Sequence, residues 1–195
     1  MDADTIKKIK ADLRKDIRSR LAELSNSTRV KIDADICKQV LEFDEYLKAD
    51  TVFLYYGIDW EINTEPLIQA AMSDGKKVVL PKCIDKIHME ARYINSLNDL
   101  IPGVYNIPEP SDESQICPTE DIDFAIIPCI ACDSDCRRLG QGGGYYDRFL
   151  RNSTFYKAAL CKSEGLVSEI PVDDFDEFVD CVITENEIIF RAAID

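Results

Sequence analysis

The sequence predicts a three-layer α/β/α fold with a mainly parallel sheet. Runs rich in β-branched and aromatic residues, such as 51–56 and 77–81, have the composition of buried strands. The segment between them, residues 64–73, opens with Thr-Glu-Pro, a typical start of a helix. Two strands joined by a helix through short loops form a βαβ unit, and such units build parallel sheets.

The first 47 residues are predicted to be helical and to pack on the α/β core. Isoleucine and leucine recur at helical spacing over residues 4–24. Ser27 and Thr28 mark a break and a restart, and the second helix is expected to continue to about residue 47. We treat residues 1–195 as one domain, because a chain of this length can bury a substantial core.

The remaining elements follow from the same signals. Asp74 and Gly75 end the helix 64–73, and the proline-rich segment 102–110 is expected to be an ordered loop. Further strands are expected over residues 87–94, 122–128, 155–161, 179–184 and 187–191, with a hairpin at the end, and short helices over 96–100 and 144–150. Because ligands of parallel sheets sit beyond the carboxyl ends of the strands, Glu61, Pro81 and the loop after Pro128 should face one crevice.

Composition and charge exclude several classes of partner. The net charge of −14 argues against a general binder of nucleic acid or anionic membrane, and 46% hydrophobic with 31% charged residues is ordinary for a globular protein. No apolar stretch approaches the roughly 20 residues of a transmembrane helix. The acidic N-terminus leads into an amphipathic helix and predicts no signal peptide. We therefore expect a cytoplasmic monomer that acts on a small molecule.

The eight cysteines are expected to be reduced, buried thiols. Cys129, Cys132 and the nearby Cys136 also invite a metal or redox interpretation. A zinc site normally needs a fourth ligand, and the only histidine, His88, is far away in the sequence. Packing at the end of an apolar strand is therefore the favoured role of these thiols.

Residues 137–148, with the sequence RRLGQGGGYYDR, form the most distinctive stretch. Four of the chain's eight glycines fall within five positions here. Glycine adopts positive φ and lets backbone N–H groups approach a ligand. The arginine guanidinium is planar and always charged, and can donate two hydrogen bonds to a phosphate or carboxylate. Because the stretch follows a strand and precedes a helix, it predicts a phosphate-binding loop, with a mobile surface turn as the alternative. It matches neither a P-loop nor a dinucleotide-binding fingerprint.

Charged residues elsewhere have two interpretations each. Lys10 and Arg14 stand four apart and share one helix face, which suits either an anionic ligand or a solvated basic face. Asp147, directly after the glycine loop, could hold a hard cation or cap a helix. Glu61, in the loop after a strand, could bind a ligand or be an ordinary surface acid.

Several motifs together resemble the 5-formyltetrahydrofolate cyclo-ligase family, also called methenyltetrahydrofolate synthetases. The stretch 138–148, R-L-G-x-G-x-G-Y-Y-D-R, is similar to the family signature and is specific. Other motifs, weak singly, agree in order and spacing over nearly the whole chain: Lys10-x-x-Leu13-Arg14, Glu61-Ile62-Asn63-Thr64, Val79-Leu80-Pro81, Ile107-Pro108-Glu109-Pro110, and Ile170-Pro171 with Asp176 and Asp180. The resemblance implies the fold shared by sugar-phosphate isomerases and coenzyme A transferases (the NagB/RpiA/CoA transferase-like fold).

The resemblance also implies an activity: ATP- and Mg²⁺-dependent conversion of 5-formyltetrahydrofolate to 5,10-methenyltetrahydrofolate, with release of ADP and phosphate. The formyl oxygen is a poor leaving group, so it is first phosphorylated. N10 then attacks the iminium phosphate, and phosphate leaves. Catalysis by such an enzyme should consist mainly of positioning and charge neutralisation.

A role is implied for each matching residue. Lys10, Arg14 and Arg138 would hold the ATP phosphates, and the nucleotide site would be completed by Gly140, Gln141, Gly142, Gly143, Gly144 and Tyr146. Asp147 and Asp176 would coordinate Mg²⁺. Glu61 would contact the pterin or N10 region and take part in catalysis. Tyr145 and Tyr146 would line the folate pocket, and Arg148 would neutralise the transferred phosphate.

Three positions depart from the family pattern. Cys136 and Asn106 stand where relatives often have glycine, and asparagine tolerates the left-handed conformation. Gly143 stands where some relatives carry a lysine, so Arg148 would have to supply that charge.

Two rival functions remain: a non-catalytic family member that binds folate or nucleotide, and a sugar-phosphate or acyl-transfer enzyme. The second is weakened because no obvious nucleophile or histidine base accompanies the glycine loop.

Overall fold

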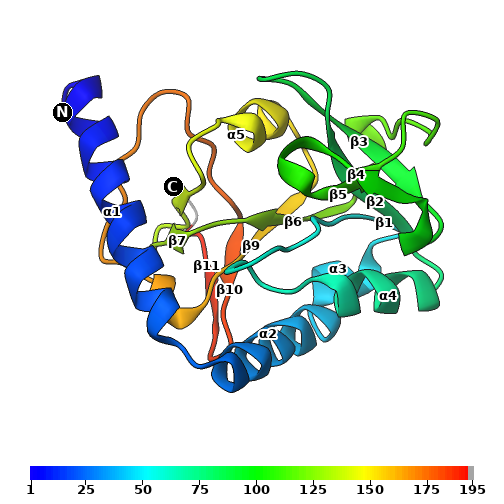
Figure 1. Cartoon of the computed structure of the whole chain (residues 1–195), viewed down its shortest axis with the longest axis horizontal. Helices are drawn as coiled ribbons and strands as arrows, with labels where there is room; N and C mark the ends of the chain where they lie inside the picture. Colours follow the sequence, from blue (N-terminus) through cyan, green and yellow to red (C-terminus); the bar gives the residue numbers. More distant parts are fainter. Residues whose placement is uncertain (193–195) are drawn as a thin grey trace.

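A central sheet with helices on both faces organises the molecule (Figure 1). The structure, a computed structural model, describes residues 1–192, without the side chain of Tyr105. The seven strands of the sheet lie in the order β11-β10-β9-β6-β1-β2-β3. Their bounds are β1 Thr51–Phe53, β2 Lys77–Cys83, β3 Met89–Ile94, β6 Phe124–Pro128, β9 Tyr156–Leu160, β10 Cys181–Ile183 and β11 Ile188–Phe190.

The sheet is parallel in its interior and antiparallel at its two edges. Strands β10, β9, β6, β1 and β2 pair in parallel, whereas β3 and β11 join antiparallel to β2 and β10. The βαβ unit β1–α4–β2 is present, with α4 at Glu65–Ser73. The prediction of an α/β fold with a mainly parallel sheet is therefore confirmed.

The helices divide between the two faces of the sheet. Helices α2 (Asn26–Leu41), α3 (Asp44–Lys48) and α4 cover one face, and α5 (Tyr145–Leu150) covers the other (Figure 1). Helix α1 (Ala3–Glu23) lies beside the sheet and contacts the short 3-10 helix η4 (Ser163–Gly165). No described helix combines the length and the apolar content that a membrane crossing requires.

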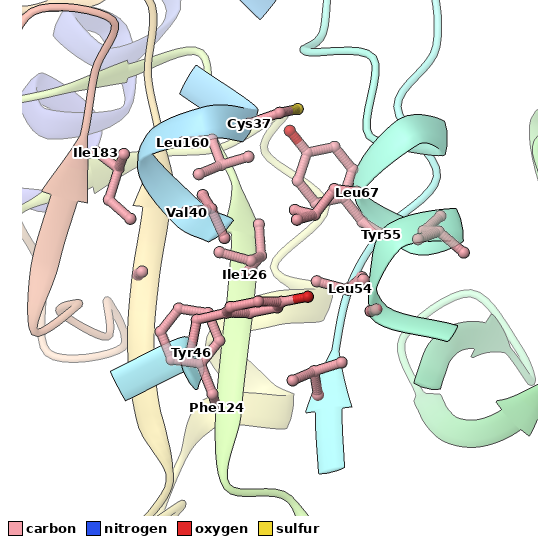
Figure 2. Packing of buried hydrophobic residues seen from close by; sticks show 14 of the residues in the cluster. Cys37, Val40, Tyr46, Leu54, Tyr55, Leu67, Phe124, Ile126, Leu160 and Ile183 are labelled. Atoms are coloured by element: carbon pink, nitrogen blue, oxygen red, sulfur yellow. The ribbon is translucent and has the colours of Figure 1, made fainter. Parts of the chain in front are cut away.

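Apolar side chains on alternate positions of the strands fill a core on each face. Figure 2 shows Phe124, Ile126 and Leu160 from β6 and β9 packed with Val40 and Leu67 from the covering helices. On the opposite face, Phe53, Ile127 and Ala159 pack with residues of α5. Because both faces are buried, the interior strands are apolar at nearly every position, which is the pattern expected of a parallel sheet.

The second helix ends earlier than the sequence predicts. It stops at Leu41, and Phe43 adopts an extended conformation before the short helix α3 begins at Asp44. The break places the Phe43 ring against Phe124 and Tyr156, with centroids 6.1 and 5.8 Å away. Burying this ring in the core is worth more than continuing a surface helix.

Thr64 occupies the N-cap position of α4, as the Thr-Glu-Pro start of this segment predicts, but its side chain does not make the expected capping hydrogen bond. Its hydroxyl binds the Tyr55 carbonyl oxygen and accepts the Gly57 N–H at 3.0 Å, so it fixes the chain leaving β1. The Asn63 side-chain oxygen accepts the Glu65 N–H instead, at 3.1 Å.

Two small sheets lie outside the predicted elements. Strands β4 (Leu100–Pro102) and β5 (Pro108–Pro110) make an antiparallel hairpin within the proline-rich segment. Strands β7 (Ala131–Cys132) and β8 (Arg138–Leu139) pair directly before the glycine loop. The second pair is what fixes the direction in which the glycine loop leaves the sheet.

Candidate active site

The candidate site lies at the edge of the sheet where the parallel strands end. Strands β1, β6 and β9 run in the same direction, so the loops that follow them gather at one edge. The loop after β1 carries Glu61, and the chain after β6 passes through β7 and β8 into the glycine loop, residues 140–144. The Glu61 loop and the chain after Pro128 thus lie at one edge, as expected, whereas Pro81 lies within β2, which continues to Cys83.

One face of α1 brings positive charge to the glycine loop. Arg14 donates from Nε to the Gly140 carbonyl oxygen at 2.7 Å, and Arg18, one turn further along, donates to the Gln141 side-chain oxygen. Burial, followed by the charge of Arg18, lowers the pKa of Arg14. The cations are therefore crowded together, and an anion bound between them would relieve the repulsion.

Lys10 is held at the same face by two carboxylates. Only 8% of Lys10 is exposed, and its ammonium group pairs with Asp176 and, at 3.5 Å, with Asp173. A buried ammonium group is costly unless it is paired, so these aspartates fix both Lys10 and the segment that carries them. The loop around residue 173 is thereby tied to α1.

The backbone of the glycine loop uses conformations that glycine favours. Gly142 has φ +98° and Gly144 has φ +67°. A Cβ on Gly142 would lie 3.3 Å from the Arg14 guanidinium, and one on Gly144 would lie 2.7 Å from Arg148 Nη1. Both neighbours are the ends of flexible arginine side chains that can shift, so the positive φ is what disfavours a side chain at these two positions.

Arg138 and Asp147 form a pair that joins β8 to α5. Arg138 Nη2 lies 2.7 Å from Asp147 Oδ1, and the Arg138 side chain is 3% exposed. Its Nε is buried and has no hydrogen-bond partner among residues 1–192. Buried donors are nearly always satisfied, so an unpaired one beside a glycine loop is a position where a ligand oxygen fits.

Asp147 and Asp176 are brought to the same region. Asp147 Oδ1 also accepts the N–H of Glu177, the neighbour of Asp176, at 3.3 Å, and both aspartates act on Arg14. Within the described residues, Asp147 Oδ2 and Asp176 Oδ1 have no hydrogen-bond or ion-pair partner. Two carboxylates with free oxygens beside the glycine loop are a donor set that suits Mg²⁺.

Glu61 is half-buried and contacts the glycine loop. Burial raises its pKa, and hydrogen bonds from the Ile58 N–H and the Gln141 side chain partly counter this. With Trp60, Cys129 and Lys162 it lines a cavity of about 10 Å³. Glu61 is therefore not an ordinary surface acid, because its carboxylate is desolvated next to the loop.

The two tyrosines of the loop have different environments. Tyr146 packs edge-on against Phe53, and the Arg138 guanidinium lies 5.8 Å from its ring; burial raises the pKa of Tyr146 well above its ordinary value. Tyr145 donates its hydroxyl to the Asp85 carbonyl oxygen at 2.9 Å. Tyr146 thus lies on the inner side of the loop, and Tyr145 ties the loop to the chain after β2.

Arg148 is exposed and bound to backbone. It donates to the carbonyl oxygens of Ile87 at 2.6 Å and Gly143 at 2.8 Å. Arg137, the other arginine that precedes the loop, pairs instead with Asp133, Asp135 and Glu169. Arg137 therefore supports the structure behind the site and does not face it.

Two departures from the family pattern have a structural explanation. Cys136 and Asn106 both have φ +60°, in the left-handed region where glycine is favoured. Asparagine tolerates this conformation, as expected. Cysteine does so less readily, and Cys136 is held there by backbone hydrogen bonds to Asp133 and Val179.

The structure gathers most of the predicted site residues and adds two that were not predicted. Those around the loop are Lys10, Arg14, Arg138, Gly140, Gln141, Gly142, Gly143, Gly144, Tyr146, Asp147, Asp176 and Glu61. Arg18 and Asp173 were missed. The four-residue spacing of Lys10, Arg14 and Arg18 was a signal that could have identified Arg18; no sequence signal singled out Asp173.

Comparisons with known proteins agree over nearly the whole chain. The sequence model of the 5-formyltetrahydrofolate cyclo-ligase family matches residues 6–185. A probable 5-formyltetrahydrofolate cyclo-ligase from Schizosaccharomyces pombe is 30% identical, over 92% of this chain and 97% of the relative. The 5-formyltetrahydrofolate cyclo-ligase of Escherichia coli K12 is 28% identical, over 88% and 98%. The NMR structure of Aquifex aeolicus 5,10-methenyltetrahydrofolate synthetase superposes with a TM-score of 0.85 at 29% identity, over 96% of this chain and 95% of that one.

The glycine loop can be tested with Gly142→Ala. Alanine at φ +98° is strained by about 1–2 kcal/mol, so the loop should relax away from this conformation and restore it only on binding an anion. We expect binding of inorganic tripolyphosphate, measured by calorimetry, to weaken about tenfold.

Gly75→Ala is the matched control. Gly75 has φ +78° at the end of α4, and nothing lies within 4 Å of its added Cβ. This variant should lose a similar free energy of unfolding and keep its affinity for tripolyphosphate. Equal affinities in both variants would show that the loop does not hold the anion.

Proposed function

The chain belongs to the 5-formyltetrahydrofolate cyclo-ligase family, and we propose that it converts 5-formyltetrahydrofolate to 5,10-methenyltetrahydrofolate at the expense of ATP, with Mg²⁺. The observation that supports this best is the convergence of Arg14 and Arg138 on a glycine loop that also contacts Glu61, with Lys10 one turn before Arg14 on α1. An anion-binding loop next to a desolvated carboxylate suits a reaction that activates an oxygen with phosphate and then closes a ring.

The proposed chemistry explains why a nucleoside triphosphate is consumed. The formyl oxygen attacks the γ-phosphorus of ATP, ADP leaves, and the oxygen becomes part of a phosphate ester. N10 then attacks the activated formyl carbon and loses its proton, and the carbon–oxygen bond breaks to release inorganic phosphate. The protein's contribution is to align the two substrates and to stabilise charge on the phosphate oxygens.

The residues around the loop fit a triphosphate. Arg14 and Lys10 supply charge from α1, and the unpaired Nε of Arg138 supplies a donor that a phosphate oxygen would satisfy. Backbone N–H groups of residues 140–144 complete the cradle. Helix α5 has only six residues, so the loop and the side chains, more than a helix dipole, would hold the phosphates.

Asp147 and Asp176 are the residues that would hold Mg²⁺. The ion, when bound, would neutralise charge on the phosphate oxygens of ATP. Each aspartate offers one free oxygen while the other oxygen pairs with Arg138 or Lys10. A bound triphosphate would draw these cations toward itself and leave the carboxylates to face the metal ion.

Glu61, Tyr145 and Tyr146 are the residues proposed to contact the folate. Glu61, with its raised pKa, is a stronger base than an exposed glutamate and would accept the proton that N10 loses. Tyr146, which faces inward, would pack on the pterin together with Tyr145. Arg148 would turn from the Gly143 carbonyl oxygen to the transferred phosphate.

We also place this activity in a cytoplasmic monomer. The eight cysteines form no disulfide, which suits a reducing compartment. The net charge of −14 makes copies of the chain repel one another.

The proposed reaction is tested by incubating the protein with 5-formyltetrahydrofolate, ATP and Mg²⁺. We expect the near-ultraviolet absorbance of the methenyl product to grow, with one ADP released per product, because phosphorylation of the formyl oxygen is obligatory. If neither product nor ADP formed while both substrates bound, the protein would be a non-catalytic binder of folate and nucleotide.

The metal site is tested by Asp176→Asn against Asp173→Asn. Both aspartates contact Lys10, but only Asp176 is proposed to bind Mg²⁺. In titrations of the reaction rate with Mg²⁺, Asp176→Asn should raise the half-saturating concentration at least about tenfold. Asp173→Asn, which removes a long and partly exposed ion pair, should change it less than about twofold. Equal shifts in the two variants would remove Asp176 from the metal site.

The role of Glu61 predicts a pH dependence. As a base Glu61 must be deprotonated, so kcat/KM should fall as the pH drops through its raised pKa, above the value of about 4.3 of an exposed glutamate. Glu61→Gln should lower kcat/KM by about 10²–10⁴ and abolish this acid limb. The control is Asp59→Asn in the same loop, where asparagine also accepts the φ of +52°. This variant should keep the acid limb but move it to lower pH, because the Asp59 charge helps to raise the pKa of Glu61. An acid limb that persists in Glu61→Gln would assign the base to another group.

A further inference from the structure

Three cysteine side chains converge behind the candidate active site. The Sγ atoms of Cys129, Cys132 and Cys161 all lie within 4.8 Å of one another, and those of Cys129 and Cys132 are 3.4 Å apart. The sequence suggested Cys136 as the third member of this group. The structure excludes it, because the Cys136 thiol is directed to the Ile189 carbonyl oxygen, 3.6 Å away.

The register of the sheet brings the third sulfur into place. Strands β6 and β9 are parallel, and their last paired residues are Pro128 and Leu160. Cys129 and Cys161 follow directly, so they leave neighbouring strands side by side. Cys132 then returns to the same point on β7, three residues after Cys129. This convergence could not be seen in the sequence, where Cys161 is 29 residues beyond Cys132.

The cluster is buried and rigidly framed. Cys132 is fully buried and Cys161 is 2% exposed. The Cys132 carbonyl oxygen accepts the Val167 N–H at 3.0 Å, which brings η4 onto the cluster. A Cβ on Gly165 would lie 2.8 Å from the Ile130 carbonyl oxygen and 3.0 Å from Cys161 Sγ, so glycine makes room for this sulfur.

We propose that Cys129, Cys132 and Cys161 form a three-thiolate site for a thiophilic metal ion of the Zn²⁺ class. Sulfur ligands at the Zn–S distance of about 2.3 Å in a tetrahedral site are about 3.8 Å apart, so the observed triangle needs shifts of less than about 1 Å. Binding releases the thiol protons, and all three ligands are sulfur, the donor that soft metal ions prefer.

A fourth ligand position is open on the side of Cys129. The cavity of about 10 Å³ that Cys129 shares with Glu61 and Lys162 has room for about one water molecule. Three protein ligands and one open position is a coordination pattern of zinc proteins. The metal ion would therefore lie deeper than the cavity, with its open position directed toward the candidate active site.

Nearby positive charge makes three thiolates tolerable. Three thiolates and Zn²⁺ sum to −1. Lys162 lines the same cavity as Cys129, and Arg138 Nη1 lies 3.4 Å from the carbonyl oxygen of Pro128, the residue before Cys129. Each of these cations also pairs with an aspartate, Asp147 or Asp33, so they reduce the excess negative charge without removing it. The site does not depend on the proposed folate reaction, since none of the three sulfurs is part of that mechanism.

A disulfide between Cys129 and Cys132 is the competing use of the same thiols. It would involve only two of the three sulfurs and would not explain why Cys161 lies beside them. The convergence of all three sulfurs favours a metal ion, and the contribution of Cys161 distinguishes the two possibilities.

The test is an anaerobic titration of the reduced, full-length protein with Cd²⁺, followed by the ultraviolet thiolate-to-cadmium absorption. We expect a band that saturates at one equivalent, and a midpoint of thermal unfolding that rises with Cd²⁺ or Zn²⁺. Cys161→Ser and, separately, Cys129→Ser should weaken Cd²⁺ binding at least about tenfold. Circular dichroism establishes that each variant is folded.

Cys83→Ser is the control, because Cys83 is a more accessible thiol that lies outside the cluster. This variant should keep the band and its stoichiometry. The proposal is overturned if no band develops, or if Cys161→Ser and Cys83→Ser behave alike. It is also overturned if Cys129 and Cys132 are found joined by a disulfide in the freshly isolated protein.

Discussion

The parallel register of β6 between β1 and β9 is the constraint on which the rest of the structure depends. It pairs Phe53 with Ala125 on one side and Pro128 with Leu160 on the other. Because the three strands run in the same direction, the Glu61 loop, the glycine loop and Cys161 all follow their strands at one edge of the sheet. A shift of β6 by one residue would also turn its buried side chains to the wrong face, so packing of both cores fixes the register. The geometry of the site is thus a consequence of core packing.

Helix α1 contributes in two ways. Its Ile17 and Leu21 pack in a separate apolar cluster with Ile130, Leu139 and Ile170, and its basic side chains face the glycine loop. Lys10 and Arg14 lie on its basic face in partly buried positions, where removing their charges from water costs free energy. Asp176 and the carbonyl oxygen of Gly140 compensate for this and hold α1 against two segments far away in the sequence. These cations are already gathered beside the loop, so binding of an anion requires side-chain shifts and no rearrangement of the backbone that carries them.

Much of the fold and the chemical character of the site could be predicted from the sequence. Apolar strands, helix-end residues and the glycine loop are local signals. They predicted the βαβ unit, which is present, and the position of the glycine loop between a strand and a helix. The break at Phe43 could not be predicted, because the burial of its ring against Phe124 is a tertiary contact. The same is true of the role of Thr64, whose hydroxyl binds the strand it follows and not the helix it precedes.

Residues from distant segments were the main omission at the site. Arg18 could have been predicted, because it lies four residues after Arg14 on the same helix face. Asp173 could not, because its pairing with Lys10 exists only where its segment contacts α1 in the folded protein. Cys161 joins Cys129 only through the pairing of β6 with β9. The left-handed conformation of Asn106 was easier to anticipate, because relatives often have glycine there and asparagine tolerates it, whereas the same φ at Cys136 was not predicted. Features that depend on neighbouring residues could thus be predicted from the sequence, whereas contacts between distant segments depend on how the strands pair in the sheet.

The central claim is that the site transfers phosphate to the formyl oxygen before the ring closes. It is tested most directly with 5-formyltetrahydrofolate labelled with ¹⁸O in the formyl group, followed by mass spectrometry of the released phosphate. The account predicts one ¹⁸O atom in each phosphate, because the formyl oxygen leaves bonded to phosphorus. Unlabelled phosphate, with the label released into water, would contradict it.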